Sequence, residues 1–377
     1  GRTQYTGATM AAAKAIVDAA QGGMVLISPE TFQRIPAKLL QNRLLIASMG
    51  EHVLGKGHEQ TRMQLYQVLA LQLVHRAAQL GPVRSVSQLS HGFLEAPCNN
   101  AAICFMNVSY LTALEMWNPV VTAAALKMWN HTVQDILTKR GGYLVEAADG
   151  LCLAAFPRPS CAIRWALESI EACLHLDWPS KLLENELGEE QFFSPLGKSH
   201  SSRFFGRRTM SLPRDPAVLH KDQQPLMDRP SVQPSMASAA SMIPLTELER
   251  VLVFRGLRMK VGIDWGAVKA DLHAATARVT FRGRVMNRAA RISNVAKCGQ
   301  VWCSEGAWEA AAPEINNLDR YPHTTKCGAK FGAAMAGHAM GDEDDSDSQE
   351  HTCVRATALG PYQLKGIVHN MELYHCY

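Results

Sequence analysis

The sequence predicts an α+β fold built on a ferredoxin-like sheet, and three observations support this prediction. The chain of 377 residues is long enough to bury a sizeable core. Between residues 101 and 190, apolar and amphipathic runs follow the order β-α-β-β-α of a split βαβ unit, and a β-α-β-α-β run follows residue 246. A segment of the second run, residues 280–301, also has a gapless counterpart at residues 4–25.

The N-terminal elements are predicted from apolar spacing and helix-end signals. Residues 8–20 are alanine-rich and end at QGG, which predicts a helix. MVLIS predicts a short strand, and SPETFQRI predicts a helix with Ser28 as its N-cap and Pro29 at its first position. MQLYQVLALQLVH predicts a final strand with an extension. Residues 80–100 are rich in Gly, Pro, Ser and Asn, which predicts a linker.

The later elements begin with AAICFMNVSYLTALE, which predicts a buried strand running into a loop. PVVTAAALKMWNHTVQDILTKR predicts an amphipathic helix that ends at Gly141–Gly142. YLVEAADGLCLAAF predicts two strands joined by a tight Asp149–Gly150 turn. We also predict a helix over PSCAIRWALESIEACLHL and a strand over LRMKVGIDWG. The last predicted elements are a helix from about residue 285 to 296 and a strand over MELYHCY.

Two insertions and one linker define the predicted domain organisation. Residues 190–246 have many Ser, Pro, Arg and Met and little periodicity, which predicts a mobile insertion. Residues 322–352 hold the acidic run GDEDDSDSQE, which we expect to be solvated. We therefore predict that residues 1–79 are the C-terminal half of a first domain, residues 80–100 a linker, and residues 101–377 a second domain carrying both insertions.

Composition excludes several classes of protein. A net charge of +4 is too small to indicate nucleic-acid or anionic-membrane binding. No apolar run approaches the roughly 20 residues of a membrane span. The ten cysteines form no CxxC pair, which argues against zinc and favours a reducing compartment. We therefore expect a cytoplasmic location. Because the chain opens in mid-pattern at Gly1, we expect it to be the cytosolic part of a larger protein.

The repeated segment differs between its copies at one polar pair. TFRGRVMNRAARISNVAKCGQV carries Asn287 and Arg291, which lie four apart and share a helix face. Its counterpart QYTGATMAAAKAIVDAAQGGMV has Ala11 and Ala15 at those positions. The guanidinium fork of arginine suits phosphate oxygens, and an asparagine amide can hold a sugar oxygen.

Two further residues extend this candidate site. Thr280 stands at a strand end seven residues before Asn287, and Lys365 lies just before the final strand, where an ammonium can meet a polyphosphate. Taken singly, each residue is more often a solvated surface group than a functional one. Their order and spacing together are more specific.

These motifs resemble the class III nucleotide cyclase catalytic domain, the family of adenylyl and guanylyl cyclases. FMNVSYLTALE resembles the family's first metal strand, and GGYLVEAADGLCLAAF its second metal hairpin. The segment from Thr280 resembles the family signature, and LKGI followed by ELY resembles its closing lysine segment. The resemblance covers about residues 100–190 and 246–377. Residues 1–70 resemble the latter half of a second such domain, in which Lys56 matches the lysine if one residue is inserted.

The resemblance implies a site shared between two domains arranged head to tail. One domain supplies two aspartates that hold two Mg²⁺ or Mn²⁺ ions, and the partner domain supplies an asparagine, an arginine and a lysine. These roles carry over to Asn287 for the ribose, Arg291 for the α-phosphate and Lys365 for the leaving pyrophosphate. The substrate implied is ATP or GTP, and the partner is a second cyclase domain in the same or another chain.

This sequence departs from the family pattern at the metal and base positions. Asn107 replaces the first metal aspartate, and Mg²⁺ prefers carboxylates to amides. Asp149 corresponds to the second metal aspartate if one residue is deleted, and is otherwise a turn residue. Glu146 resembles the guanine-reading glutamate of guanylyl cyclases, whereas Thr280 occurs at its position in some adenylyl cyclases. The base therefore stays open.

The losses in the two copies are complementary. The first copy has lost the asparagine and arginine, and the second has lost a metal aspartate. The leading hypothesis is the catalytic region of a tandem cyclase that makes a 3′,5′-cyclic monophosphate and pyrophosphate, an enzyme as part of a longer chain. The alternative is a catalytically degenerate cyclase-homology module that binds a nucleotide or a partner protein.

Overall fold

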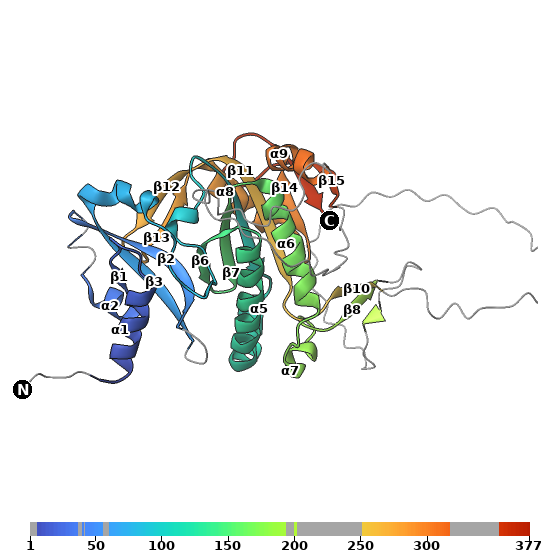
Figure 1. Cartoon of the computed structure of the whole chain (residues 1–377). Coiled ribbons are helices and arrows are strands. Elements are labelled where there is room, and N and C mark those ends of the chain that lie inside the picture. Colours follow the sequence, from blue (N-terminus) through green and yellow to red (C-terminus); the bar gives the residue numbers. More distant parts are fainter. Residues whose placement is uncertain are drawn as a thin grey trace, which may run out of the picture. The chain divides into compact units, whose positions relative to one another are not determined.

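The structure is a computed structural model that describes residues 6–36, 40, 42–55, 60–193, 200–201, 251–316 and 354–377 (Figure 1). It divides into two compact units, residues 1–189 with 254–377, and residues 190–253. Apart from residues 190–193 and 200–201, the two predicted insertions lie outside the described residues, and so does Lys56. In the smaller unit, β8 (Gln191–Phe193) pairs antiparallel with β9 (His200–Ser201) and lies next to β10 (Val251–Phe254).

The larger unit contains a seven-stranded sheet in the order β15-β16-β14-β11-β5-β7-β6. Its strands are β5 (Asn100–Val108), β6 (Tyr143–Ala148), β7 (Leu151–Phe156), β11 (Met259–Ala267), β14 (Val301–Ser304), β15 (Ala356–Tyr362) and β16 (Met371–Cys376). The antiparallel group β11-β5-β7-β6 has the strand order 4-1-3-2 of a ferredoxin-like unit. The predicted α+β ferredoxin-like fold is therefore confirmed. β14 joins β11 in parallel, and β16 and β15 extend the sheet.

Helices cover both faces of this sheet. Cys104 and Met106 of β5 pack in one core with α5 (Pro119–Lys139), α6 (Pro159–Leu174) and α9 (Glu305–Asn316). Ala101 and Ile103 point to the opposite face and pack with α8 (Arg284–Val295). Because successive side chains of a strand alternate in direction, burial on both faces explains why β5 is a continuous apolar run.

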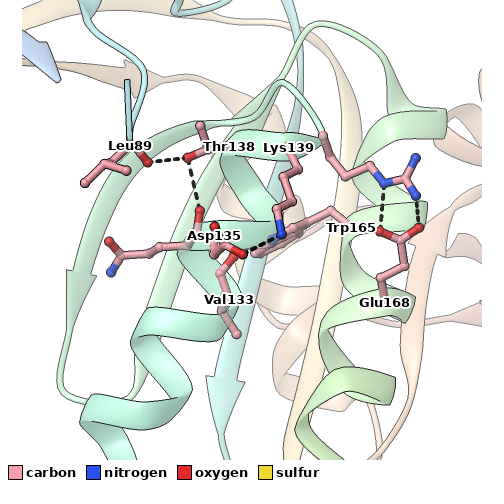
Figure 2. Close-up of polar contacts among 9 residues, drawn as sticks. Leu89, Val133, Asp135, Thr138, Lys139, Trp165 and Glu168 are labelled. Carbon is pink, nitrogen blue, oxygen red and sulfur yellow. Dashed lines mark hydrogen bonds and ion pairs between the residues drawn. The ribbon is translucent and has the colours of Figure 1, made fainter. Parts of the chain in front are cut away.

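The C-terminal part of α5 is fixed to its surroundings by polar contacts (Figure 2). The indole of Trp165 on α6 donates to a main-chain carbonyl of α5 at 3.0 Å. Arg140, which follows α5, forms an ion pair with Glu168 of α6, with 2.7 Å between Nε and Oε2. Thr138 Oγ1 donates to the carbonyl oxygen of Leu89 at 2.8 Å. The helix is thereby held both to α6 and to the segment predicted as the linker.

The β6–β7 hairpin matches its prediction. Asp149 and Gly150 connect the strands, with φ of 47° and 70°. Two successive positive φ values define a type I′ turn, for which Asp-Gly is a preferred sequence. The predicted Asp149–Gly150 turn is confirmed.

Some of the observed elements were not predicted. The loop expected after β5 contains a helix, α4 (Leu111–Trp117), which starts from Tyr110 in a left-handed conformation without a side-chain cap. A hairpin of β12 (Lys269–His273) and β13 (Arg278–Arg282) precedes α8. Its turn contains Ala277 at φ 54° and no Gly, Asn or Pro, so the sequence lacked the usual turn signal.

The N-terminal segment repeats the topology of the C-terminal one. It contains α1 (Ala8–Ala19), β1 (Leu26–Ile27), α2 (Pro29–Arg34), β2 (Leu44–Leu54) and β3 (Thr61–Ala70). Its sheet has the order β1-β3-β2-β4. The first three strands are arranged like their counterparts β14, β16 and β15 in the larger sheet, and β4 (Ser87–Gln88) is an additional strand. This segment is followed by a 3₁₀ helix (Leu71–Gln79) and a short 3₁₀ turn (Phe93–Glu95). A short helix elsewhere in the chain is α7 (Ser180–Leu183). The predicted linker therefore supplies a strand to the N-terminal sheet.

The two copies also agree residue by residue. Gly7 precedes α1 with φ 108° and ψ −176°, and Gly283 precedes α8 with φ 132° and ψ −176°. Ser28 caps α2 by accepting from the amide of Thr31, as predicted, and Ser304 accepts from the amide of Ala307 in the same way. These matches support a duplication. The domain boundaries at residues 79 and 100 stay predictions.

A close backbone approach sets the position of α8. A Cβ on Gly262 of β11 would lie 2.1 Å from the amide nitrogen of Ser293 and 2.6 Å from the carbonyl oxygen of Ala289. Because both atoms belong to the main chain of α8, a side chain can be accommodated only by moving the helix. We expect Gly262→Ala to lower the free energy of unfolding by about 1–3 kcal/mol.

Urea denaturation of the two alanine variants measures this effect. Gly306→Ala on α9 is the matched control, because a Cβ there meets no atom within 4 Å. We expect that control to be neutral or slightly stabilising, since alanine is preferred to glycine in helices. Equal stability of the two variants would show that α8 does not pack directly on β11.

Candidate functional site

The helix α8 presents two different faces. Ala289 and Ser293 are fully buried and point toward the sheet, whereas Asn287 and Arg291 are exposed. Residues four apart lie on the same helix face, and the two pairs are offset by two residues, which places them on opposite sides. Asn287 and Arg291 therefore share one outward face, as predicted, and point away from β5 and β11.

The segment that carries Lys365 packs beside α8. Leu364, immediately before it, is buried in a cluster with Ile292 of α8 and with Ala296, which follows that helix. Ile292 is in turn the neighbour of Arg291 in sequence. Lys365 itself is exposed. The structure thus brings the elements of these two candidate residues together, with both side chains open to solvent.

Thr280 lies on β13, the strand that packs against the same helix. Its neighbours Val279 and Phe281 pack in one cluster with Val285 and Ala289 of α8. The Thr280 hydroxyl donates to the carbonyl oxygen of Asp271 across the β12–β13 hairpin at 3.1 Å. A hydroxyl held in this way is positioned by the hairpin.

The candidate metal and base-reading residues lie on other elements, namely β5 and the β6–β7 hairpin. Asn107 points toward α8 and donates from Nδ2 to the Ser293 hydroxyl at 2.8 Å, which leaves its carbonyl oxygen as the only further polar atom. Asp149 is exposed in the hairpin turn. Glu146 is exposed next to a register shift that follows Leu144.

The described residues do not form a divalent-metal site. Within the part of the chain that the structure describes, no group of three or more His, Cys, Asp or Glu side chains is placed to hold a metal ion. The side chain at the first metal position, Asn107, is neutral, and Mg²⁺ prefers carboxylate oxygens.

Lys260 is a residue that the sequence reasoning missed. It lies on β11 directly opposite Asn107 in the strand register, and its ammonium donates to the carbonyl oxygen of Asn294 at 3.2 Å. It lines an open pocket of about 910 Å³ with Val108, Ser109, Tyr110, Leu111, Thr112, Ala113, Ala296, Lys297 and Cys298. The only sequence signal was a charged residue alternating with apolar ones in a strand.

A buried ion pair joins α8 to β11. Arg288 Nε donates to Asp264 Oδ2 at 2.5 Å, and the Ser304 hydroxyl donates to Asp264 Oδ1 at 2.6 Å. Burial raises the pKa of Asp264, against the opposing effects of the Ser304 hydroxyl and the Arg288 guanidinium. Since Arg288 follows Asn287 in sequence, this pair fixes the rotation of the helix that carries the candidate residues.

Comparison with known proteins places the chain near one group of enzymes. No family model matches it. It is 23% identical to an adenylate cyclase of Podospora anserina over 302 residues, which are 80% of this chain and 11% of that protein. It is 24% identical over 214 residues to an adenylate cyclase of Lachancea kluyveri, covering 55% of this chain and 9% of that protein. The chain therefore spans about a tenth of the length of these relatives.

One further curated protein and two solved structures are also similar to this chain. A receptor-type adenylate cyclase of Trypanosoma brucei brucei is 22% identical over 221 residues, 59% of this chain and 15% of that protein. Adenylate cyclases of Trypanosoma brucei solved in their monomeric state align with 18% identity and a TM-score of 0.45, over 74% of this chain and 88% of theirs. A guanylate cyclase domain of Catenaria anguillulae in complex with GTP aligns with 12% identity and a TM-score of 0.40, over 74% and 96%.

The resemblance to nucleotide cyclases that the motifs predicted is confirmed by these curated relatives, all of which are named adenylate cyclases. In the described ranges, no helix has both the length and the apolar composition required to cross a membrane.

Proposed function

We propose that this chain is the catalytic region of a tandem nucleotide cyclase, which converts a purine nucleoside triphosphate to its 3′,5′-cyclic monophosphate and pyrophosphate. The observation that carries this proposal is the outward face of α8. Asn287 and Arg291 are exposed there, beside the segment of Lys365, and point away from their own β5. A site that needs both this face and metal-binding carboxylates therefore has to be assembled from two domains.

Each of the three residues has a role that suits its chemistry. The Asn287 amide can hold a ribose oxygen and orient the sugar. The planar guanidinium of Arg291 can accompany charge that develops on the α-phosphate, and the Lys365 ammonium can hold the departing pyrophosphate. Two Mg²⁺ or Mn²⁺ ions bound by carboxylates of the partner domain would supply phosphate polarisation and activation of the 3′-hydroxyl.

The two copies support one working site. Ala11 and Ala15 on α1 stand where α8 has its polar pair, and Asn107 stands where a metal aspartate is expected. The working site then combines the face of α8 with the carboxylates of a first domain. The second site, which contains Asn107, has no catalytic activity in this proposal. The setting we propose is cytosolic.

ATP is the substrate that we favour. The curated relatives are named adenylate cyclases, and Thr280 suits that choice by the family pattern. Glu146 is exposed next to an irregularity in the β6–β7 pairing. Its resemblance to the guanine-reading glutamate of guanylyl cyclases therefore carries less weight. Comparing turnover of ATP and GTP by the tandem protein decides between them.

The alternative function is a degenerate module that binds a nucleotide or a partner protein without turnover. The neutral Asn107 and its hydrogen bond to Ser293 favour this alternative, because they remove a metal ligand. Pyrophosphate release from ATP or GTP with millimolar Mg²⁺ separates the two functions. We expect activity in the tandem protein and little or none in this chain alone.

Restoring the carboxylate is a direct test on this chain. We expect Asn107→Asp to raise Mg²⁺-dependent pyrophosphate release, because two copies can then pair the new carboxylate of one with Arg291 of the other. The Ser293 hydroxyl can donate to the new carboxylate, so the fold should persist. Asn107→Leu is the control. Unchanged turnover in Asn107→Asp at concentrations where dimers form would favour the binding module.

A further inference from the structure

Tyr143 is a buried aromatic residue that contacts both sequence neighbours of Thr280. It lies on β6 and is 2% exposed. Its hydroxyl oxygen accepts a hydrogen bond from the amide of Val279 at 2.8 Å. Its ring meets the ring of Phe281 edge to face, with the centroids 6.5 Å apart and an interplanar angle of 82°. Tyr143 therefore holds β13 on either side of a candidate base-reading residue.

The hydrogen bond from Val279 connects two separate sheets. Among the described residues, β13 pairs with β12 only, and these strands form a sheet of their own. The amide of Val279 donates instead to Tyr143, on a strand of the seven-stranded sheet. A buried main-chain N–H without a partner is costly, so the phenol hydroxyl stabilises the hairpin at this point. The hydroxyl thereby ties β13 to the seven-stranded sheet.

Thr280 lies between the two residues that Tyr143 contacts. Val279 and Phe281 are buried in one cluster with Tyr143. Because side chains alternate along a strand, the Thr280 side chain points to the opposite face of β13. The position and direction of the Thr280 side chain are therefore set from the buried face of the strand.

The strand that carries Tyr143 also carries Glu146. The pairing of β6 with β7 shifts by one residue after Leu144, so that Glu146 lies opposite Leu153. Leu153 packs in the same cluster as Tyr143. Because directly opposed residues share a sheet face, the shift places Glu146 on the face of Tyr143, although the two lie three positions apart. Tyr143 thus connects the strand of one candidate base-reading residue to the strand of the other.

We propose that Tyr143 is a positioning residue for selection of the purine base. It acts by fixing where Thr280 stands relative to Glu146. A base is recognised by hydrogen bonds of defined length and direction, so a small displacement of β13 weakens the discrimination between adenine and guanine. This inference rests on the proposed function, which places the base near Thr280.

Tyr143→Phe tests this role, because it removes the hydroxyl and keeps the ring. In the tandem protein with Mg²⁺, we expect the ratio of kcat/KM for ATP to kcat/KM for GTP to fall about fivefold or more. The fall should come mainly from a higher KM for ATP, because a base contact acts alike in the ground state and the transition state. Tyr374→Phe is the matched control. Its ring stacks on Trp308 of α9, in the other core of the sheet, and its removal should leave the ratio unchanged.

A double-mutant cycle with Thr280→Val separates positioning from a merely structural role. Thr280→Val alone should lower the ratio by about the same factor, and Tyr143→Phe/Thr280→Val should lower it no further, because Tyr143 acts through Thr280. Additive losses would overturn the inference. If Tyr143→Phe fails to fold, Phe281→Leu removes the ring contact on the other side of Thr280 and should lower the ratio in the same way. An unchanged ratio in that variant would also overturn the inference.

Calorimetry with ATP and GTP as separate probes distinguishes this inference from the proposed function. A tandem protein that binds both nucleotides without turnover would contradict the cyclase proposal. A lower ratio of ATP affinity to GTP affinity in Tyr143→Phe would then still support the role of Tyr143. Turnover with the same preference in wild type and Tyr143→Phe would instead overturn the positioning role and leave the cyclase proposal standing.

Discussion

In the full tandem protein, Arg291→Ala should reduce turnover by about a hundredfold or more while barely changing the affinity for nucleotide. The reason is differential binding, since the guanidinium meets charge that grows at the α-phosphate only in the transition state. A hundredfold loss corresponds to about 2.7 kcal/mol, at roughly 1.36 kcal/mol for each factor of ten. Because Arg291 is exposed in this structure, its removal should not affect folding. Steady-state turnover and apparent affinity measure the effect.

The first copy supplies the control for this prediction. Ala15 stands at the position equivalent to Arg291 on α1, which starts with the same backbone geometry as α8. Installing Ala15→Arg in the Arg291→Ala protein should not rescue turnover, because the site facing α1 has Asn107 in place of a metal aspartate. Equal turnover of wild type and Arg291→Ala would remove the catalytic interpretation of the repeat and leave the binding module.

Much of the architecture could be predicted because its signals are local. The order of apolar and amphipathic runs predicted the 4-1-3-2 sheet, and Asp149–Gly150 predicted the hairpin, since the turn chemistry and the strands lie next to each other in sequence. The Ser28 cap was predicted for the same reason. The helix α4 was missed because it starts from a left-handed Tyr110 without a capping side chain.

The site was predicted less completely, because its missing parts depend on long-range pairing. Lys260 and Asn107 are neighbours only through the register of β5 and β11, which no local pattern encodes. Asp264 and Arg288 lie 24 positions apart and meet because α8 packs across β11. By contrast, Asn287 and Arg291 were placed on one face by helix geometry alone. Local periodicity thus predicted which residues share a face, but not what each face meets.

The second large effect that we expect concerns the buried ion pair. Arg288→Met should lower the free energy of unfolding by about 3 kcal/mol near neutral pH, because it leaves the Asp264 carboxylate buried without a cationic partner. This loss is at the lower end of the range observed when one partner of a buried ion pair is removed. We expect the lower end because 33% of the Arg288 side chain is exposed, whereas the Asp264 side chain is 2% exposed. Denaturant unfolding at several pH values measures the loss.

The pH dependence identifies the cause of this loss. Burial raises the pKa of Asp264 above its value in the unfolded chain, although the Ser304 hydroxyl and the Arg288 charge oppose the shift. The folded state therefore binds the proton more tightly, and the free energy of unfolding falls as pH rises between the unfolded and folded pKa values. Removing Arg288 takes away one opposing effect, so this fall should become steeper and extend to higher pH. The double variant Arg288→Met/Asp264→Asn should regain most of the lost stability, because an amide at position 264 carries no charge and can still accept from Ser304. A loss that is the same at acidic and neutral pH, and that Asp264→Asn does not relieve, would show that Arg288 stabilises α8 through packing of its alkyl chain alone.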